Sequence, residues 1–215
     1  MLYHPTEGEV YMKKVLLRPR TCFLMTKIGD EVPEQISQIR RSLSRQLKKV
    51  NIELIDANSI ITGGDFLIKI WELIISVPLG IAILTEELSS ETKSNIFFEL
   101  GILKTLGKAA LVIKTKECKI PSDFIRTEYI NYNNKFRYTF KKYLNNFLNQ
   151  ALHYNTMSSE LGKNPLVSID YLKRASLIGH DNSIEEKLTL KINQFLEMIN
   201  LDDDLKKEIN LILRQ

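Results

Sequence analysis

Short apolar runs alternate with amphipathic patterns over residues 20–135 of the chain. Continuous apolar runs predict strands, which we place at 21–26, 52–55, 80–84, 109–114 and 128–132. Apolar residues recurring three and four positions apart predict helices, which we place at 34–49, 66–76 and 95–106. Strands that alternate with helices indicate βαβ crossovers, so the pattern predicts an α/β fold with a parallel sheet.

From residue 136 the pattern is helical to the end, with helices predicted at 136–154, 165–178, 183–199 and 203–214. We therefore divide the chain into an α/β nucleotide-binding domain, 1–139, and an all-helical extension, 140–215, for sensing or oligomerisation. The segment from Tyr171 to Ala175 resembles half of a tetratricopeptide-type repeat. A single copy favours a helical appendage over a repeat array.

Charge and composition narrow the class of protein. Of the 215 residues, 30 are Lys or Arg and 26 are Asp or Glu, and the whole surplus of four positive charges lies within 1–139. This surplus suits an anionic ligand such as a nucleotide. The basic cluster at 40–49 follows a helical pattern and is interpreted as a solvated face, so nucleic acid is not an expected partner.

Several other classes are not supported by the sequence. Cys22 and Cys118 lie in apolar runs and are expected to be buried and reduced. The three histidines are scattered, so we expect no metal, and no cofactor is expected. The apolar stretch 66–84 is interrupted by charges, Pro and Gly, and the first ten residues lack an apolar core, so we expect a cytoplasmic protein with no membrane partner. No Gly-rich phosphate loop follows any predicted strand, which excludes an ordinary dinucleotide-binding or P-loop domain.

The most informative segment is 95–103, in which apolar residues surround a single charge, Glu99. A helix beginning at Asn95 would place Glu99 in about its first turn, near the positive helix end and just past the carboxyl edge of a strand. Asn95 lies four residues earlier on the same face. Two interpretations remain open: a functional carboxylate, or a Glu that only complements the helix dipole.

The run Asn95-Ile-Phe-Phe-Glu99-Leu-Gly101 resembles the signature helix of the superfamily that contains TIR-like domains and nucleoside 2-deoxyribosyltransferases. Other segments resemble this superfamily in the same order: Asp56, Gly63-Gly64, Ile68–Leu73, Ile81–Thr85, Ile120–Phe124 and Tyr132. The resemblance covers about residues 20–135 and extends over several elements in order.

The resemblance implies a flavodoxin-like α/β fold and a role for Glu99 at the C1′ carbon of a ribose or deoxyribose. A carboxylate there can stabilise the oxocarbenium-like state formed when an N-glycosidic bond breaks. The implied substrate-binding residues are Thr26, Lys27, Gly29, Asp30, Gly63, Gly64, Thr85 and Asn95. For the loop after the first strand, an ordinary polar loop is an equal alternative, and the two glycines can equally serve a turn.

The chain departs from the superfamily pattern at Ile83, where deoxyribosyltransferase-like members often carry an Asp. An apolar strand ending in Thr85 favours the TIR side, although the usual tryptophan before the Glu is absent. Trp71 instead lies on an amphipathic helix and is predicted to pack in the core.

The leading hypothesis is a TIR-like effector that hydrolyses or cyclises NAD, with NAD as substrate and Glu99 as the catalytic carboxylate. The resemblance implies a role in bacterial antiviral or stress defence and assembly into a homo-oligomer. Two alternatives stay open: a nucleoside or nucleotide N-glycosidase or deoxyribosyltransferase, and a non-catalytic nucleotide sensor or adaptor.

Overall fold

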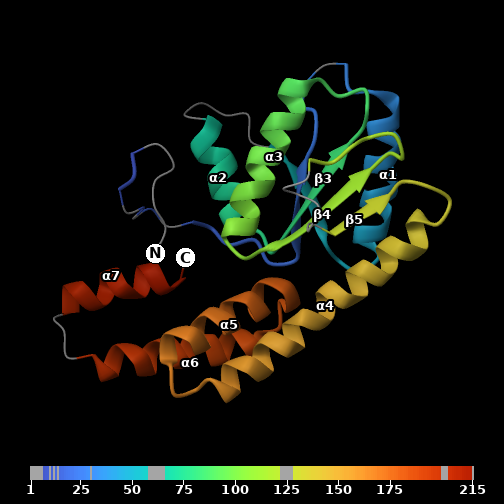
Figure 1. Ribbon diagram of the computed structural model, residues 1–215. Coiled ribbons are helices and arrows are strands. Elements are labelled where there is room, and N and C mark those ends of the chain that lie inside the picture. The colour runs from blue at the N-terminus through green and yellow to red at the C-terminus, as the bar shows by residue number, and fades with distance from the viewer. Residues whose placement is uncertain are drawn as a thin grey trace. The chain divides into compact units, whose positions relative to one another are not determined.

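The structure is a computed structural model that describes residues 7–9, 11, 13, 15–29, 31–57, 66–121, 128–199 and 203–214 (Figure 1). The chain divides into two compact units. One consists of Arg20–Asn145, and the other combines Met1–Pro19 with Asn146–Gln215. The roles predicted for an α/β domain and a helical extension stay predictions.

Five parallel strands form the sheet of the first unit, in the order β2-β1-β3-β4-β5. They are β1 (Thr21–Met25), β2 (Glu53–Asp56), β3 (Leu79–Leu84), β4 (Ala109–Lys114) and β5 (Glu128–Asn131). Every residue of β1 and β3 is buried, as expected of central strands whose two faces are both covered. The parallel α/β fold and its flavodoxin-like strand order are confirmed.

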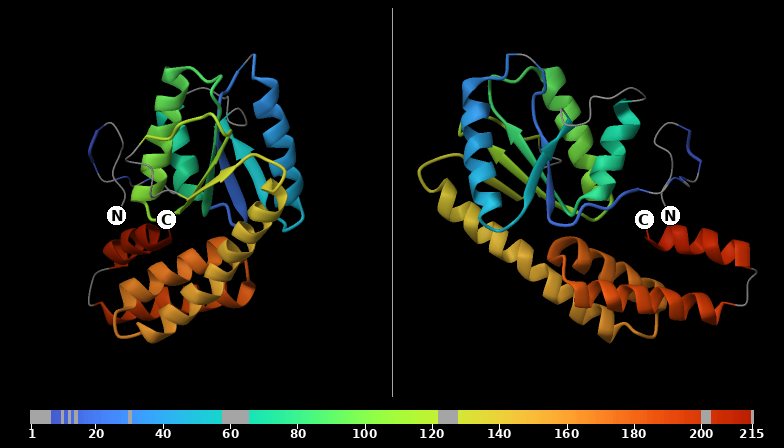
Figure 2. Two further views of the ribbon diagram at one scale, coloured as in Figure 1. Left: turned by 45° about the vertical axis from the view of Figure 1, so that its right-hand side comes forward. Right: turned by 180° about the vertical axis from the view of Figure 1, so that it is seen from behind.

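Helices cover both faces of this sheet (Figures 1 and 2). Helix α1 (Glu34–Lys48) lies on one face, and α2 (Phe66–Ser76) and α3 (Ser90–Thr105) pack together on the other. Trp71 of α2 is buried, which confirms its predicted role in the core. The start of α4 also belongs to this unit, and the buried rings of Phe136 and Phe140 stack there 5.5 Å apart.

The second unit is helical, with most of α4 (Phe136–Glu160) followed by α5 (Pro165–Gly179), α6 (Asn182–Met198) and α7 (Asp203–Arg214). Its core brings together Leu172, Ala175 and Ile184, with Tyr154 and Leu188 packed against them. The α5–α6 turn is tight because His180 adopts a left-handed conformation with φ 50°.

Two predicted boundaries were wrong. Helix α3 begins at Ser90, five residues before the predicted start at Asn95. Helix α4 continues to Glu160 rather than ending at Tyr154. In both cases the terminal residues of the helix are mostly polar. The three-to-four-residue spacing of apolar positions, which predicts a helix, is therefore weak there.

Both cysteines are free and buried, as predicted. Among the helices that the structure describes, none has the length and apolar character needed to cross a membrane.

Candidate functional site

The sheet has a topological switch point between β1 and β3, which are neighbours in the sheet. From β1 the chain crosses to β2 through α1, and from β3 it crosses to β4 through α3 on the opposite face. In open α/β sheets, ligands bind beyond the carboxyl ends of the strands at this kind of position. The residues that follow β1 and β3 are therefore the first place to look for a site.

Thr26 and Thr85 follow directly after these two strands. Their side chains are buried, with exposed fractions of 8% and 0%, and neither Oγ1 atom has a hydrogen-bond partner among the residues that the structure describes. A buried hydroxyl without a partner costs free energy, so it is rare unless something else satisfies it. The two hydroxyls are thus buried, unsatisfied polar groups at the switch point.

Glu99 lies deeper along its helix than the sequence predicts. Ser89 caps α3 by accepting a hydrogen bond from the Thr92 backbone N–H at 3.1 Å, which starts the helix at Ser90. Glu99 is therefore the tenth residue of α3, in its third turn. The expectation that Glu99 lies near the positive helix end was wrong, because the dipole effect fades within the first turn. An explanation of Glu99 as a group that only complements the helix dipole is excluded for the same reason.

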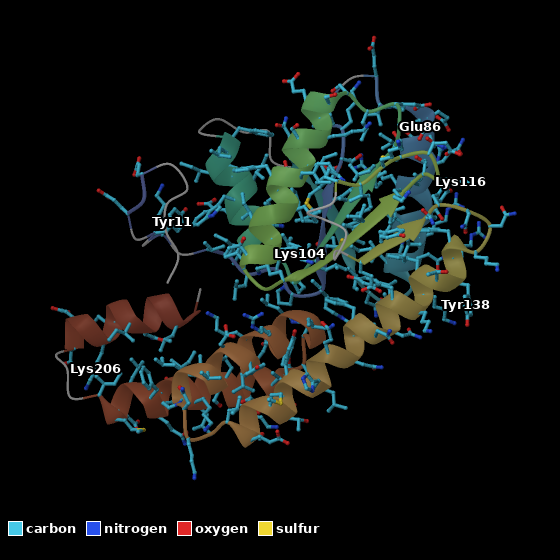
Figure 3. All side chains as sticks on the ribbon, in the orientation of Figure 1. Tyr11, Glu86, Lys104, Lys116, Tyr138 and Lys206 are labelled. Carbon is cyan, nitrogen blue, oxygen red and sulfur yellow. The ribbon has the colours of Figure 1, made fainter. Side chains whose placement is uncertain are left out.

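A close packing contact fixes the height of Glu99 relative to the sheet. A Cβ added to Gly80 on β3 would lie 2.5 Å from Cδ1 of Leu103, so α3 approaches β3 at this point. Glu99 precedes Leu103 by one turn, or about 6 Å of helix, which equals about two strand residues. Its Cα therefore lies about one helical turn nearer the carboxyl ends of the strands than the Cα of Leu103. Figure 3 shows Lys104 at the far end of the same helix.

The electrostatic state of Glu99 is unusual. Its side chain is half-buried, and loss of solvent raises the pKa of its carboxyl from the ordinary 4.5 to about 7. Within the described ranges, no ion pair or hydrogen bond reaches this carboxylate to offset the cost of its charge. Strongly perturbed carboxyl groups of this kind gather at functional sites, although structural positions also produce them.

The remaining predicted residues differ in how they are placed. Asn95 is exposed on α3, one turn before Glu99. Lys27 is half-buried and its Nζ donates to the Glu31 carbonyl oxygen at 3.0 Å, so it holds the loop after β1. Gly29 in that loop has φ +90°, a conformation that favours glycine. The predicted residues Asp30, Gly63 and Gly64 lie outside the described residues.

A carboxylate just beyond the carboxyl end of β3 was missed from the sequence. Glu86 comes two residues after β3 and accepts a hydrogen bond from the hydroxyl of Thr115, which follows β4. This hydrogen bond, with help from Lys93, lowers the pKa of Glu86. The signal in the sequence was the position of Glu86 just past a strand end. Several other polar residues of that loop lie at similar positions, so this signal did not single out Glu86.

Ile83 occupies the place of the expected strand Asp. It is fully buried and pairs in register with Ile113 of β4. This strand position therefore provides no polar group.

No metal site is formed by the described residues, because no three His, Cys, Asp or Glu side chains gather there. His180 instead lies 3.2 Å from the Glu185 carboxylate in the helical unit.

No family model and no curated protein matches the sequence. Among solved structures, the chain is similar to the 2-deoxyribosyltransferase of the psychrotolerant bacterium Bacillus psychrosaccharolyticus. The identity is 13% and the TM-score 0.42, over 56% of this chain and 90% of that chain.

Proposed function

We propose that the α/β unit breaks the N-glycosidic bond of a nucleoside or nucleotide, with Glu99 as the carboxylate that faces the anomeric carbon. The observation that carries this proposal is the half-buried Glu99 carboxyl, whose pKa is raised to about 7 and whose charge no described group neutralises. The resemblance of the segment around Glu99 to the TIR-like and deoxyribosyltransferase superfamily agrees with it.

The chemistry needs little beyond such a group. When the bond from C1′ to the base nitrogen breaks, its electron pair leaves with the base and C1′ becomes an oxocarbenium-like centre. An ionised carboxylate in a poorly solvated position stabilises that positive charge more strongly than one in water. Water then attacks C1′ and loses a proton, which the departing base of a nucleoside accepts; where the base departs neutral, the proton passes to solvent. Glu99 is ionised above its raised pKa, so activity is expected to rise with pH.

Thr26 and Thr85 are proposed to bind the substrate. Each hydroxyl can donate one hydrogen bond and accept others, which suits sugar hydroxyls or a phosphate. Binding would also satisfy two buried groups that otherwise lack partners. The binding roles of Lys27, Gly29, Asp30, Gly63, Gly64 and Asn95 stay predictions.

NAD is the more specific proposal for the substrate. It rests on the resemblance, and on Ile83, an apolar residue where deoxyribosyltransferase-like members often have Asp. In NAD the nicotinamide departs as a neutral molecule, so one carboxylate suffices without a strong general acid. Roles in defence and in a homo-oligomer are part of the same proposal.

The test is to incubate the full chain with NAD and a panel of ribonucleosides and deoxyribonucleosides, and to measure the free base released. Three proteins are compared: wild type, Glu99→Gln, and Glu91→Gln as the matched control, because Glu91 is an exposed carboxylate on the same helix. We expect release by wild type and Glu91→Gln, and a loss of at least about a hundredfold in Glu99→Gln.

The outcomes separate the alternatives. Release from NAD alone favours the TIR-like proposal, and release from nucleosides favours an N-glycosidase or transferase. Binding of a nucleotide without release from any substrate, at any protein concentration tested, would identify a sensor and contradict the proposal. Equal release by Glu99→Gln would contradict the role of this residue.

A further inference from the structure

A groove of about 470 Å³ lies between the C-terminal half of α1 and the first turn of α4, within the unit Arg20–Asn145. Its lining residues are Ser42, Arg45, Gln46, Lys48, Lys49 and Arg137. Four of the six are cations with exposed side chains, and none is acidic.

Helical geometry explains how α1 presents its share of the groove. Ser42, Arg45, Gln46 and Lys49 are spaced three and four residues apart, so they form one stripe along the helix. This stripe runs beside the buried one that anchors α1 to the sheet. One wall of the groove is therefore formed by a helix whose adjacent stripe is buried in the core.

Ion pairing divides the basic cluster that the sequence shows as one group. Arg40 pairs with Asp56, and Arg41 pairs with Glu34 at 2.7 Å. In the part of the chain that is described, no carboxylate pairs with any of the four cations of the groove. The cations at 40 and 41 are thus paired with carboxylates, whereas those at 45, 48 and 49 form a basic surface without such pairs among the described residues.

Favourable interaction with the helix dipole explains only some of these four cations. Arg45 and Lys48 lie in the last turn of α1, where a cation complements the negative helix end. Arg137 is the second residue of α4, where a cation opposes the helix dipole and no acidic residue of the first turn offsets it. Figure 3 labels its neighbour Tyr138 at the start of this helix. Helix stability therefore does not account for Arg137.

We propose that this groove binds a chain of two or more linked phosphate groups carried by a small ligand. Guanidinium and ammonium groups are the usual partners of phosphate oxygens, and four of them without a competing carboxylate suit several negative charges. No aromatic ring lines the groove, whereas sites for single-stranded nucleic acid combine basic grooves with rings on which bases stack.

This site is separate from the one proposed for bond cleavage. Helix α1 covers one face of the sheet, and α3, which carries Glu99, covers the other (Figure 2). Phosphate-chain binding should therefore survive in Glu99→Gln, and its failure would leave the proposed cleavage untouched.

The experiment is calorimetric titration of the full chain with inorganic tripolyphosphate at low salt. The test variant is Lys49→Gln with Arg137→Gln. The control is Lys163→Gln with Lys187→Gln, which removes the same charge from exposed positions elsewhere. We expect binding to wild type and control, about tenfold weaker binding to the test variant, and weakening as salt rises.

Circular dichroism of both variants establishes that they fold. If the test variant does not fold, Arg137→Lys replaces it and must bind more weakly than wild type, because it loses the guanidinium fork. ATP that competes with tripolyphosphate supports the proposal. No binding to wild type, equal binding by the test variant, or a single-stranded oligonucleotide that binds without being displaced by tripolyphosphate would overturn it.

Discussion

The Glu99→Gln variant should be more stable than wild type, and this difference in the free energy of unfolding should grow as the pH rises. The folded-state pKa of this carboxyl is raised to about 7, whereas an unfolded chain holds it at about 4.5. The unfolded state therefore binds fewer protons between these values, and the wild type loses stability as the pH rises through them. Below both values Glu99 is neutral in either state, so the Gln variant differs little from wild type there.

The size of the effect follows from the two pKa values. Their difference, at about 1.36 kcal/mol per pH unit, sets an upper bound of about 3 kcal/mol. Because the side chain is half-buried rather than enclosed, solvent screens part of the cost, and we expect about 1–2 kcal/mol.

Urea unfolding of wild type, Glu99→Gln and Glu91→Gln at pH 4.5 and pH 8 measures this directly. The advantage of Glu99→Gln over wild type should grow by about 1–2 kcal/mol between the two pH values, while Glu91→Gln shows no such growth. An advantage that stays constant or shrinks between pH 4.5 and pH 8 would refute the claim that burial raises this pKa.

Three further predictions concern packing, capping and thiol reactivity. Gly80→Ala should lower the free energy of unfolding by about 1–3 kcal/mol, because its Cβ would collide with Leu103; an unchanged urea midpoint would contradict this. Ser89→Ala should cost about 1 kcal/mol by removing the α3 cap, and an unchanged stability would show that the cap contributes nothing. Burial raises the pKa of the Cys22 thiol, so Cys22 and Cys118 should react with a thiol reagent only in denaturant; rapid reaction of the folded protein would contradict their burial.

The sheet was predictable because its strands are continuous apolar runs. Residues 80–84 carry no polar side chain, which is typical of a central parallel strand, and β3 is fully buried. The start of α3 was not predictable from apolar period, since its first turns are polar and mostly exposed. Its cap is visible afterwards in the sequence as Ser89 followed by Glu91 in the first turn.

The candidate site was predictable in part. The segment around Glu99 marks the residue, but the degree of its burial depends on how α3 lies against β3. The unpartnered hydroxyls of Thr26 and Thr85 could not be predicted, because hydrogen bonding depends on the surroundings that the folded chain provides. That Lys49 and Arg137 line the same groove likewise depends on tertiary structure, since they lie far apart in the sequence.

The most direct test of the central claim is the pH dependence of free-base release by wild type and Glu99→Gln on the best substrate of the panel. If Glu99 acts as an ionised carboxylate, kcat/KM of wild type rises about tenfold per pH unit below 7 and levels off above it. The Gln variant should be at least about a hundredfold slower above pH 7 and lack this rise. A wild-type profile that is flat through pH 7, or a Gln variant that keeps the wild-type rate, would contradict the account.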